Sequence, residues 1–196
     1  TTPVLTNGQV VDVVVTNART CSATSAGIIN TVIGFPLPTI SSSDANNSFC
    51  SGTSVTFTAT GGTNFDFRVN GSSVQNSGAP TYTTSALTDG HVVDVIVSNA
   101  GGCSTLSVGI ANTVLALPAA TISSSDADNS FCAGTSVTFT AGGLGTKFDF
   151  RVNGVSVQNG ASTAYTTTGL TNEQVVDGIV PTAGGCAAPS HRIQNA

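Results

Sequence analysis

Alternation of apolar and polar residues is the clearest pattern along this chain. Val55–Ala59 alternates between the two classes, and Phe65–Val69 does the same with aromatic residues at the apolar positions. Period-two alternation in segments rich in β-branched and aromatic residues predicts half-buried strands. No segment shows the 3.6-residue apolar period of an amphipathic helix. The pattern therefore predicts an all-β protein.

Turn residues divide the alternating pattern into short strands. Asn70-Gly71 predicts a type I′ hairpin turn, because both central residues of that turn need positive φ. The predicted strands are Thr39–Ser42, Val55–Ala59, Phe65–Val69, Ser72–Gln75, Thr81–Thr84, His91–Ser98 and Ser104–Val114. Seven strands within about 80 residues are typical of an immunoglobulin-like β-sandwich. Its predicted core is Val55, Phe57, Phe65, Phe67, Val69, Tyr82, Leu87, Val93, Val95 and Val97.

The whole pattern recurs along the chain. The segment 39–59 returns almost unchanged at 121–141, and the cysteines recur with a spacing of 82 or 83 residues. A period this long is typical of a tandem array of small domains. We therefore predict the second half of a repeat at 1–36, a complete repeat at 37–117, and a further repeat at 118–196 that is truncated or divergent at its end. Pro-containing joints near Pro38 and Pro118 predict neighbouring domains with limited bending.

The composition narrows the possible partners. Only 8% of the residues are charged and the formal net charge is −5, so a nucleic-acid partner, which needs clustered Lys and Arg, is not expected. No apolar run reaches the roughly 18 residues that would span a bilayer. Five cysteines at recurring positions, without metal-binding spacing, indicate an oxidising environment outside the cytoplasm.

Two disulfide arrangements fit the predicted strands. Cys50 precedes the second strand and Cys103 follows the sixth, and these strands run in the same direction in an immunoglobulin-like domain. The two residues would then lie about 30–40 Å apart, whereas a disulfide needs Cα atoms within about 7 Å. We therefore prefer Cys50–Cys186, between domains, with the partners of Cys103 and Cys132 outside this chain. The alternative is Cys50–Cys103 and Cys132–Cys186 within domains; in both arrangements Cys21 has its partner outside.

Charged residues on the predicted strands suggest a cross-strand ion pair. If the third and sixth strands are neighbours, Arg68 lies opposite Asp94, and both side chains face outward with Asp66. Arg151 and Asp177 would repeat the pairing in the last repeat. An exposed pair of this kind contributes about 0.2–1 kcal/mol, which favours a role in register rather than in function.

Candidate ligand-binding and catalytic residues are few. Asp44 and Asn46, and their counterparts Asp126 and Asp128, have the alternating oxygen ligands that calcium prefers. The alternative is an Asx-rich turn between the first two strands, and calcium is the one cofactor that we consider. His91 and His191 have no evident Ser, Cys or acid partners for catalysis, so we predict no catalytic residues.

The recurring unit resembles the PKD-like and immunoglobulin-like repeats of giant cell-surface adhesins of gliding Bacteroidetes. The resemblance covers nearly the whole chain and rests on segments 125–141, 148–159 and 94–103. It implies type IX secretion, outer-membrane anchoring, and contact with the motility and secretion machinery of that membrane. Residues 178–196 depart from the pattern, since Pro181 falls where a strand should continue.

These features together predict a structural and adhesive stalk segment of a secreted filament, and not an enzyme. Its expected partners are neighbouring repeats of the same chain, with surface glycans or abiotic surfaces as further candidates. The alternative is a glycan- or ice-binding module, for which rows of exposed threonines such as Thr56 and Thr58 would supply the surface. Few aromatic residues remain outside the predicted core for binding sugars.

Overall fold

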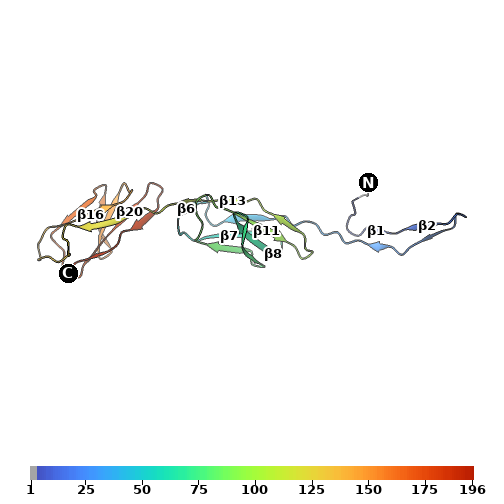
Figure 1. Cartoon of the computed structure of the whole chain (residues 1–196), viewed down its shortest axis with the longest axis horizontal. Helices are drawn as coiled ribbons and strands as arrows, with labels where there is room; N and C mark the ends of the chain where they lie inside the picture. The colour runs from blue at the N-terminus through green and yellow to red at the C-terminus, as the bar shows by residue number, and fades with distance from the viewer. Residues whose placement is uncertain (1–3) are drawn as a thin grey trace. The chain divides into compact units, whose positions relative to one another are not determined.

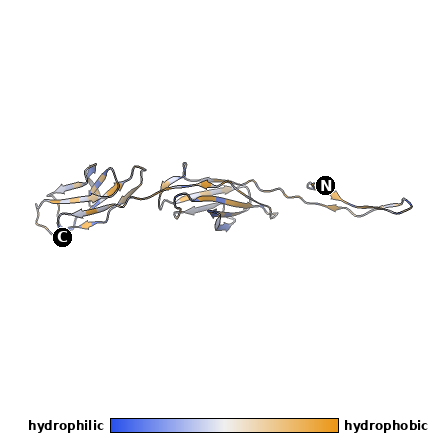
Figure 2. Cartoon of the chain, turned by 45° about the horizontal axis from the view of Figure 1, so that its top comes forward, coloured by the Kyte–Doolittle hydropathy of each residue, from blue (hydrophilic) through white to orange (hydrophobic). Residues whose placement is uncertain are grey.

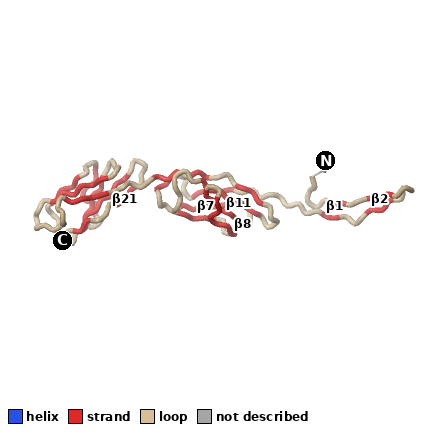
Figure 3. Tube along the Cα trace, in the orientation of Figure 1, coloured by secondary structure: helices blue, strands red, loops and turns tan. Residues whose placement is uncertain are grey.

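The chain forms strands and turns throughout, with no helix among the residues described (Figure 3). The computed structural model describes residues 4–196. No helix in that range is long and apolar enough to cross a membrane. Two compact units can be distinguished, and each is described by itself. The first runs to Ser43 and includes Thr56–Thr83 and Val92–Ala111; the second comprises Asp44–Val55, Thr84–His91 and Asn112–Ala196. The predicted domain boundaries at residues 36 and 117 stay predictions.

The first unit begins with a long hairpin (Figure 1). Its strand pairs are β1 (Val10–Val11) with β4 (Ile28–Ile29), and β2 (Val14–Thr16) with β3 (Ser22–Thr24). All four strands are exposed to solvent, although β1, β2 and β4 are rich in valine and isoleucine. The hairpin therefore has the sequence of a buried element without a covering layer among the described residues.

The rest of the first unit is a two-sheet sandwich. One sheet has the order β10 (Thr81–Thr84), β7 (Val55–Thr60), β5 (Thr39–Ser42). The other has the order β12 (Ser104–Leu106), β11 (Val92–Ser98), β8 (Asn64–Val69), β9 (Ser72–Ser77), with β13 (Ile110–Ala111) also paired to β11. The fourth strand, β9, thus joins β8 in the second sheet. Two antiparallel sheets in this order make an immunoglobulin-like β-sandwich.

Aromatic and valine side chains fill the space between these sheets. Phe57 and Phe67, one from each sheet, are completely buried. The Tyr82 ring covers both, with ring centroids 6.5 Å from Phe57 and 5.8 Å from Phe67. The predicted core residues are buried, except that Val69 and Tyr82 are only partly covered. The predicted type I′ turn is present, with φ of 49° at Asn70 and 80° at Gly71.

The second unit contains a sandwich of the same design. One sheet has the order β15 (Thr121–Ser124), β16 (Val137–Gly142), β19 (Ala164–Thr167). The other has the order β18 (Val155–Gly160), β17 (Phe148–Val152), β20 (Val175–Pro181), β21 (Ala187–Pro189), with β22 (Ile193–Gln194) also on β20. Phe139 and Phe150 form the centre of its core, at the positions that Phe57 and Phe67 have in the first sandwich.

Two strand predictions need correction. The segment Ser104–Val114 was expected to be one strand, but it forms β12, β13 and the first residues of β14 (Thr113–Leu115), separated by short irregular stretches. No strand was predicted at Ser48–Cys50, but this segment forms the strand β6, which pairs in parallel with β14. Parallel pairing between distant segments leaves no local turn signal in the sequence, which explains the omission.

Candidate functional site

The disulfide of the second unit is the most distinctive chemical feature of the described residues. Cys50 is the last residue of β6, where it lies opposite Leu115 of β14. Hydrogen bonds continue this pairing on both sides, from the Thr113 amide to the Asn47 carbonyl (2.8 Å) and from the Ser51 amide to the Leu115 carbonyl (2.8 Å). Cys50 is therefore held by regular backbone pairing.

Cys186 is the last residue of the turn that connects β20 to β21 (Thr182–Cys186). We call this turn, between the sixth and seventh strands of a repeat, the F–G turn. The Thr182 amide donates to the Cys186 carbonyl (2.7 Å), and the Gly185 amide donates to the Thr182 carbonyl (3.1 Å). Gly185 has a φ of 83°, which favours glycine. A Cβ on Gly184 would lie 3.1 Å from Cδ1 of Leu115, so the turn approaches the end of β14 closely.

The bond joins Cys50 to Cys186 across 136 positions of sequence, with a Cα–Cα distance of 5.6 Å. This is the pairing between consecutive repeats that we preferred. The within-repeat pairs Cys50–Cys103 and Cys132–Cys186 are not formed, since Cys103 and Cys132 are free, as is Cys21. We call the group formed by Cys50, Leu115, Gly184 and Cys186 the disulfide joint.

The first unit contains the same arrangement without the bond. Its F–G turn, Asn99–Cys103, follows β11, and a Cβ on Gly101 would collide with the Ile33 side chain. Ile33 and Gly101 correspond by the repeat spacing to Leu115 and Gly184. The Asn99 amide nitrogen Nδ2 donates to the Gly34 carbonyl (2.8 Å), and Cys103 Sγ lies 3.6 Å from the Ile33 carbonyl oxygen. The contact between an F–G turn and the last residues of the preceding repeat therefore recurs, with Ile33 in an irregular segment where Leu115 lies in a strand.

The predicted cross-strand ion pair forms in the first sandwich. Arg68 lies directly opposite Asp94, and Nε of Arg68 donates to Oδ1 of Asp94 at 2.7 Å. The side chains are only 20% and 15% exposed, so the expectation of a fully exposed pair was wrong. The hydrogen bond to Asp94 raises the pKa of Arg68, which keeps this cation charged at every relevant pH.

The corresponding prediction for the last repeat was wrong. Arg151 lies opposite Asp177 as expected, but Nε of Arg151 donates to Asp149 at 2.9 Å. Asp177 instead lies 3.4 Å from Arg192. The position of Arg192 is occupied by Gly109 in the preceding repeat, where no side chain can compete with Arg68. Arg192 lies directly before β22 (Ile193–Gln194), and the two repeats therefore differ in the partners of the paired Arg and Asp.

The candidate calcium residues form turn hydrogen bonds in this structure. The Ser48 amide donates to Asp44 Oδ1 (2.9 Å) and to Asn46 Oδ1 (3.0 Å). The Ser130 amide donates in the same way to Asp126 Oδ1 (3.0 Å) and Asp128 Oδ1 (3.2 Å). These contacts are those of Asx turns. No group of three metal-binding side chains occurs within residues 4–196, and calcium binding stays untested.

The two histidines lie apart from any nucleophile–acid arrangement. The Thr88 amide donates to Nδ1 of His91 (3.2 Å), so Nε2 carries the proton toward the Thr88 hydroxyl (2.8 Å). Gln174 accepts from the Thr171 amide at the corresponding place. His91 therefore replaces a glutamine in closing a turn. His191 is exposed, in the irregular stretch between β21 and β22.

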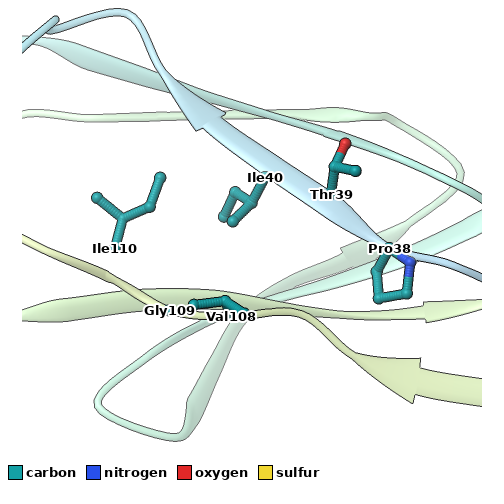
Figure 4. Close-up of a pocket in the computed structure, with 6 residues that line it drawn as sticks. All are labelled: Pro38, Thr39, Ile40, Val108, Gly109 and Ile110. Atoms are coloured by element: carbon teal, nitrogen blue, oxygen red, sulfur yellow. The ribbon is translucent and has the colours of Figure 1, made fainter.

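In each sandwich, one threonine of the predicted row bonds to a threonine of the neighbouring strand. Thr56 Oγ1 lies 2.8 Å from Thr83 Oγ1, and Thr138 repeats the contact with Thr166 at 2.8 Å. Hydroxyls that bond to each other offer fewer free groups to a sugar or to ice. The hollow between β5 and β13, of about 290 Å³, is lined by apolar residues such as Ile40 and Ile110 and by no titratable side chain (Figure 4). Thr39 supplies the one polar side chain among its six lining residues.

Sequence reasoning missed a set of buried polar residues that directly follow the short last strands of each sandwich. The Ser107 hydroxyl accepts from the Val95 amide (3.1 Å), and the Ser190 hydroxyl accepts from the Gly178 amide (2.9 Å). Asn112 and Asn195 donate from Nδ2 to the carbonyls of His91 and Gln174. Their recurrence 83 residues apart was the available signal. These hydrogen bonds hold the irregular segments of the last strands against β11 and β20 and the residues just before them.

Comparison with known proteins gives only distant structural likeness. No family model and no curated protein matches the chain. Among solved structures it is similar to fibronectin(III)-like modules of Clostridium thermocellum CbhA (16% identity, 81% of this chain and 92% of that chain, TM-score 0.42). It is also similar to murine CEACAM1b (11%, 82% and 99%, 0.36) and to the mouse nectin-like molecule 4 ectodomain (13%, 80% and 62%, 0.33). The fold class follows from the strand order itself.

Proposed function

We propose that this chain is a force-transmitting segment of an extracellular array of immunoglobulin-like repeats, in which disulfide bonds join consecutive repeats. The observation that carries the proposal is the bond between Cys50 and Cys186, which joins a strand of one predicted repeat to the F–G turn of the next. Disulfides persist in oxidising compartments outside the cytoplasm. A structural role needs no catalytic group, which agrees with the turn-forming roles of the candidate residues.

The bond changes the path of a pulling force. Tension applied to the two chain ends passes from Cys50 through the sulfur atoms to Cys186, so the intervening residues carry none of it. Most strands of both sandwiches, from β7 to β20, lie between these two cysteines. The joint therefore protects both cores from extension, which suits a stalk under load.

Single-molecule pulling on the whole chain tests this function. The intact chain should hide the segment enclosed by the bond, whose ends are 136 positions apart, and reduction should release about 490 Å of additional contour length at roughly 3.6 Å per residue. The matched control is the C103S/C132S variant, which keeps the bond and should extend like the parent chain. Equal contour lengths before and after reduction would rule out the proposed force path.

The finer assignment is a stalk of a cell-surface adhesin that takes part in attachment and gliding, with type IX secretion and outer-membrane anchoring. Its support is the resemblance of segments 125–141 and 148–159 to repeats of such adhesins. Antibodies against this chain should label intact, non-permeabilised cells of its source, and replacement of the joint cysteines should weaken attachment under flow. Labelling that requires permeabilisation would contradict the surface location.

A further inference from the structure

A small polar cavity lies beside the turn between β17 and β18 in the last sandwich. It has a volume of about 240 Å³ and is lined by Asn153, Gly154, Val175, Asp177 and Arg192. Polar and apolar residues are mixed along the strands of this sandwich (Figure 2). Asn70 and Gly71, the counterparts of the two turn residues, are exposed in the preceding repeat as well. The exposure of this turn is therefore a property of the repeat, wherever the repeat stands in the chain.

Asp177 has an incomplete set of hydrogen-bond partners. Its side chain is only 13% exposed, and Oδ1 is buried without a hydrogen-bond partner. Oδ2 lies 3.4 Å from Nε of Arg192, which is longer than a charge-assisted hydrogen bond of about 2.7–2.9 Å. A carboxylate that is largely removed from water normally accepts hydrogen bonds. Asp177 therefore keeps acceptor capacity that no residue in the range 4–196 uses.

Two hydrogen-bond donors line the same cavity. Oδ1 of Asn153 accepts from the Val175 amide at 2.9 Å, which fixes the orientation of the side-chain amide and leaves Nδ2 as its donor. The guanidinium of Arg192 carries five N–H groups, and its side chain is 78% exposed. Neither side chain donates a hydrogen bond to another residue within 4–196. The cavity therefore combines an acceptor with two donors.

The preceding repeat provides an internal comparison. There, Asp94 stands at the position of Asp177 and accepts from Nε of Arg68 at 2.7 Å, so this carboxylate has its own cation. Gly109 stands at the position of Arg192 and supplies no donor side chain. The combination of an underused carboxylate and an exposed guanidinium is therefore specific to the last repeat.

The charges around the cavity balance. Arg151 donates to Asp149 at 2.9 Å, and Arg192 lies beside Asp177. Two carboxylates are thus matched by two guanidinium groups. A ligand with a net charge would leave one charge of this group without compensation, whereas a neutral ligand leaves the balance unchanged. The site therefore favours a neutral molecule that both donates and accepts hydrogen bonds.

A sugar ring meets these requirements. Each hydroxyl group both donates and accepts, so neighbouring hydroxyls can satisfy a carboxylate and a guanidinium together. The cavity of about 240 Å³ is smaller than the sites of about 300–1,000 Å³ that hold drug-sized ligands, which suits a single ring. The side chain of Val175 supplies an apolar contact for the C–H groups of that ring.

We propose that this cavity binds one neutral hexose ring through two adjacent hydroxyl groups. One hydroxyl donates to the carboxylate of Asp177 and accepts from Arg192, and its neighbour accepts from Nδ2 of Asn153. The carboxyl torsion is broad, so either oxygen of Asp177 can turn toward the cavity. None of the five lining residues is aromatic, so a dissociation constant of about 1 mM is expected for one site. The last repeat thereby gains sugar recognition in addition to its role in transmitting force.

NMR titration of the whole chain with the methyl glycosides of glucose, galactose and mannose tests the site. At least one glycoside should shift the backbone amide signals of Asn153, Gly154 and Val175 in a saturable manner. The Val175 amide is a direct reporter, because it bonds to the side chain of Asn153. If none of the three glycosides shifts these signals, the proposal is wrong.

Two variants test the contacts. Asp177→Asn keeps the shape of the side chain and removes its charge, and Arg192→Gly copies Gly109 at an exposed position. Each should weaken binding at least tenfold. The matched control is Asp94→Asn, the same change at the same position of the preceding repeat, which should bind the glycoside like the parent chain. Unchanged binding in either site variant, or an equal loss in the control, would overturn the proposal.

A charged sugar distinguishes the remaining alternative. Methyl glucuronide carries a carboxylate that can pair with Arg192 alone. If it binds more tightly than all three neutral glycosides, and Asp177→Asn leaves its binding unchanged, the cavity is an anion site and the assignment to a neutral sugar fails. None of these results bears on the force path through Cys50 and Cys186, which pulling tests separately.

Discussion

Cys50 is bonded to Cys186 although 136 positions separate them and a nearer candidate, Cys103, belongs to the same predicted repeat. The choice follows from where the strands place the two ends of the bond. Cys50 is the last residue of β6 and lies opposite Leu115. Gly184, in the same F–G turn as Cys186, lies close to the side chain of that leucine. Consecutive repeats are thereby joined by a covalent bond as well as by the chain.

Removal of the joint disulfide should destabilise the protein. The C50S/C186S variant is expected to lose about 2–5 kcal/mol of unfolding free energy, because the bond restricts a long loop in the unfolded chain. Urea denaturation with reduced and oxidised samples measures the loss. C103S/C132S removes two thiols and no bond, and should denature like the parent; an equal loss in both variants would contradict the assignment.

Gly184 should be required for efficient formation of the bond. Gly184→Val places side-chain atoms against Leu115, and overpacking of this kind costs about 1–3 kcal/mol. At about 1.4 kcal/mol the equilibrium between thiols and disulfide in a glutathione buffer shifts tenfold toward the thiols. The second substitution Leu115→Ala should restore most of the loss. A double variant as impaired as the single one would show that the close approach is not the cause.

Arg192 should control the ion pair of the last repeat. In the parent chain, a double-mutant cycle between Arg151 and Asp177 should give a coupling energy near zero, because Asp177 bonds to Arg192 instead. In the background of Arg192→Gly, which copies Gly109, the coupling should rise to about 0.5 kcal/mol. The Arg68–Asp94 cycle is the positive reference. A sizeable coupling in the parent chain would refute this competition.

His91 should be replaceable by glutamine without loss. His91→Gln restores the residue found at Gln174, whose Oε1 accepts from the Thr171 amide at 2.9 Å, so the stability change should stay within about 0.5 kcal/mol. His91→Ala leaves the Thr88 amide without this acceptor and should cost about 1 kcal/mol. Thermal or urea unfolding distinguishes the two. A marked loss on glutamine substitution would reveal a role that only imidazole can fill.

Much of the fold could be predicted because its signals are local. Alternation in Val55–Ala59 and Phe65–Val69 predicted two core strands, and Asn70-Gly71 predicted the turn between β8 and β9. The register that places Arg68 opposite Asp94 also followed, since side chains alternate and one face must be buried. The parallel pair β6–β14 was missed because its members lie more than 60 positions apart and no hairpin turn connects them.

The sequence by itself determined the repeat, the long core strands, and most positions that form each core, because period-two burial and turn chemistry act between near neighbours. Only the tertiary structure decided which residues meet across the chain. It paired Cys50 with Cys186 and placed Asp177 beside Arg192 rather than Arg151. These outcomes depend on which distant segments come within a few ångströms of each other, and side-chain identity alone does not carry that information.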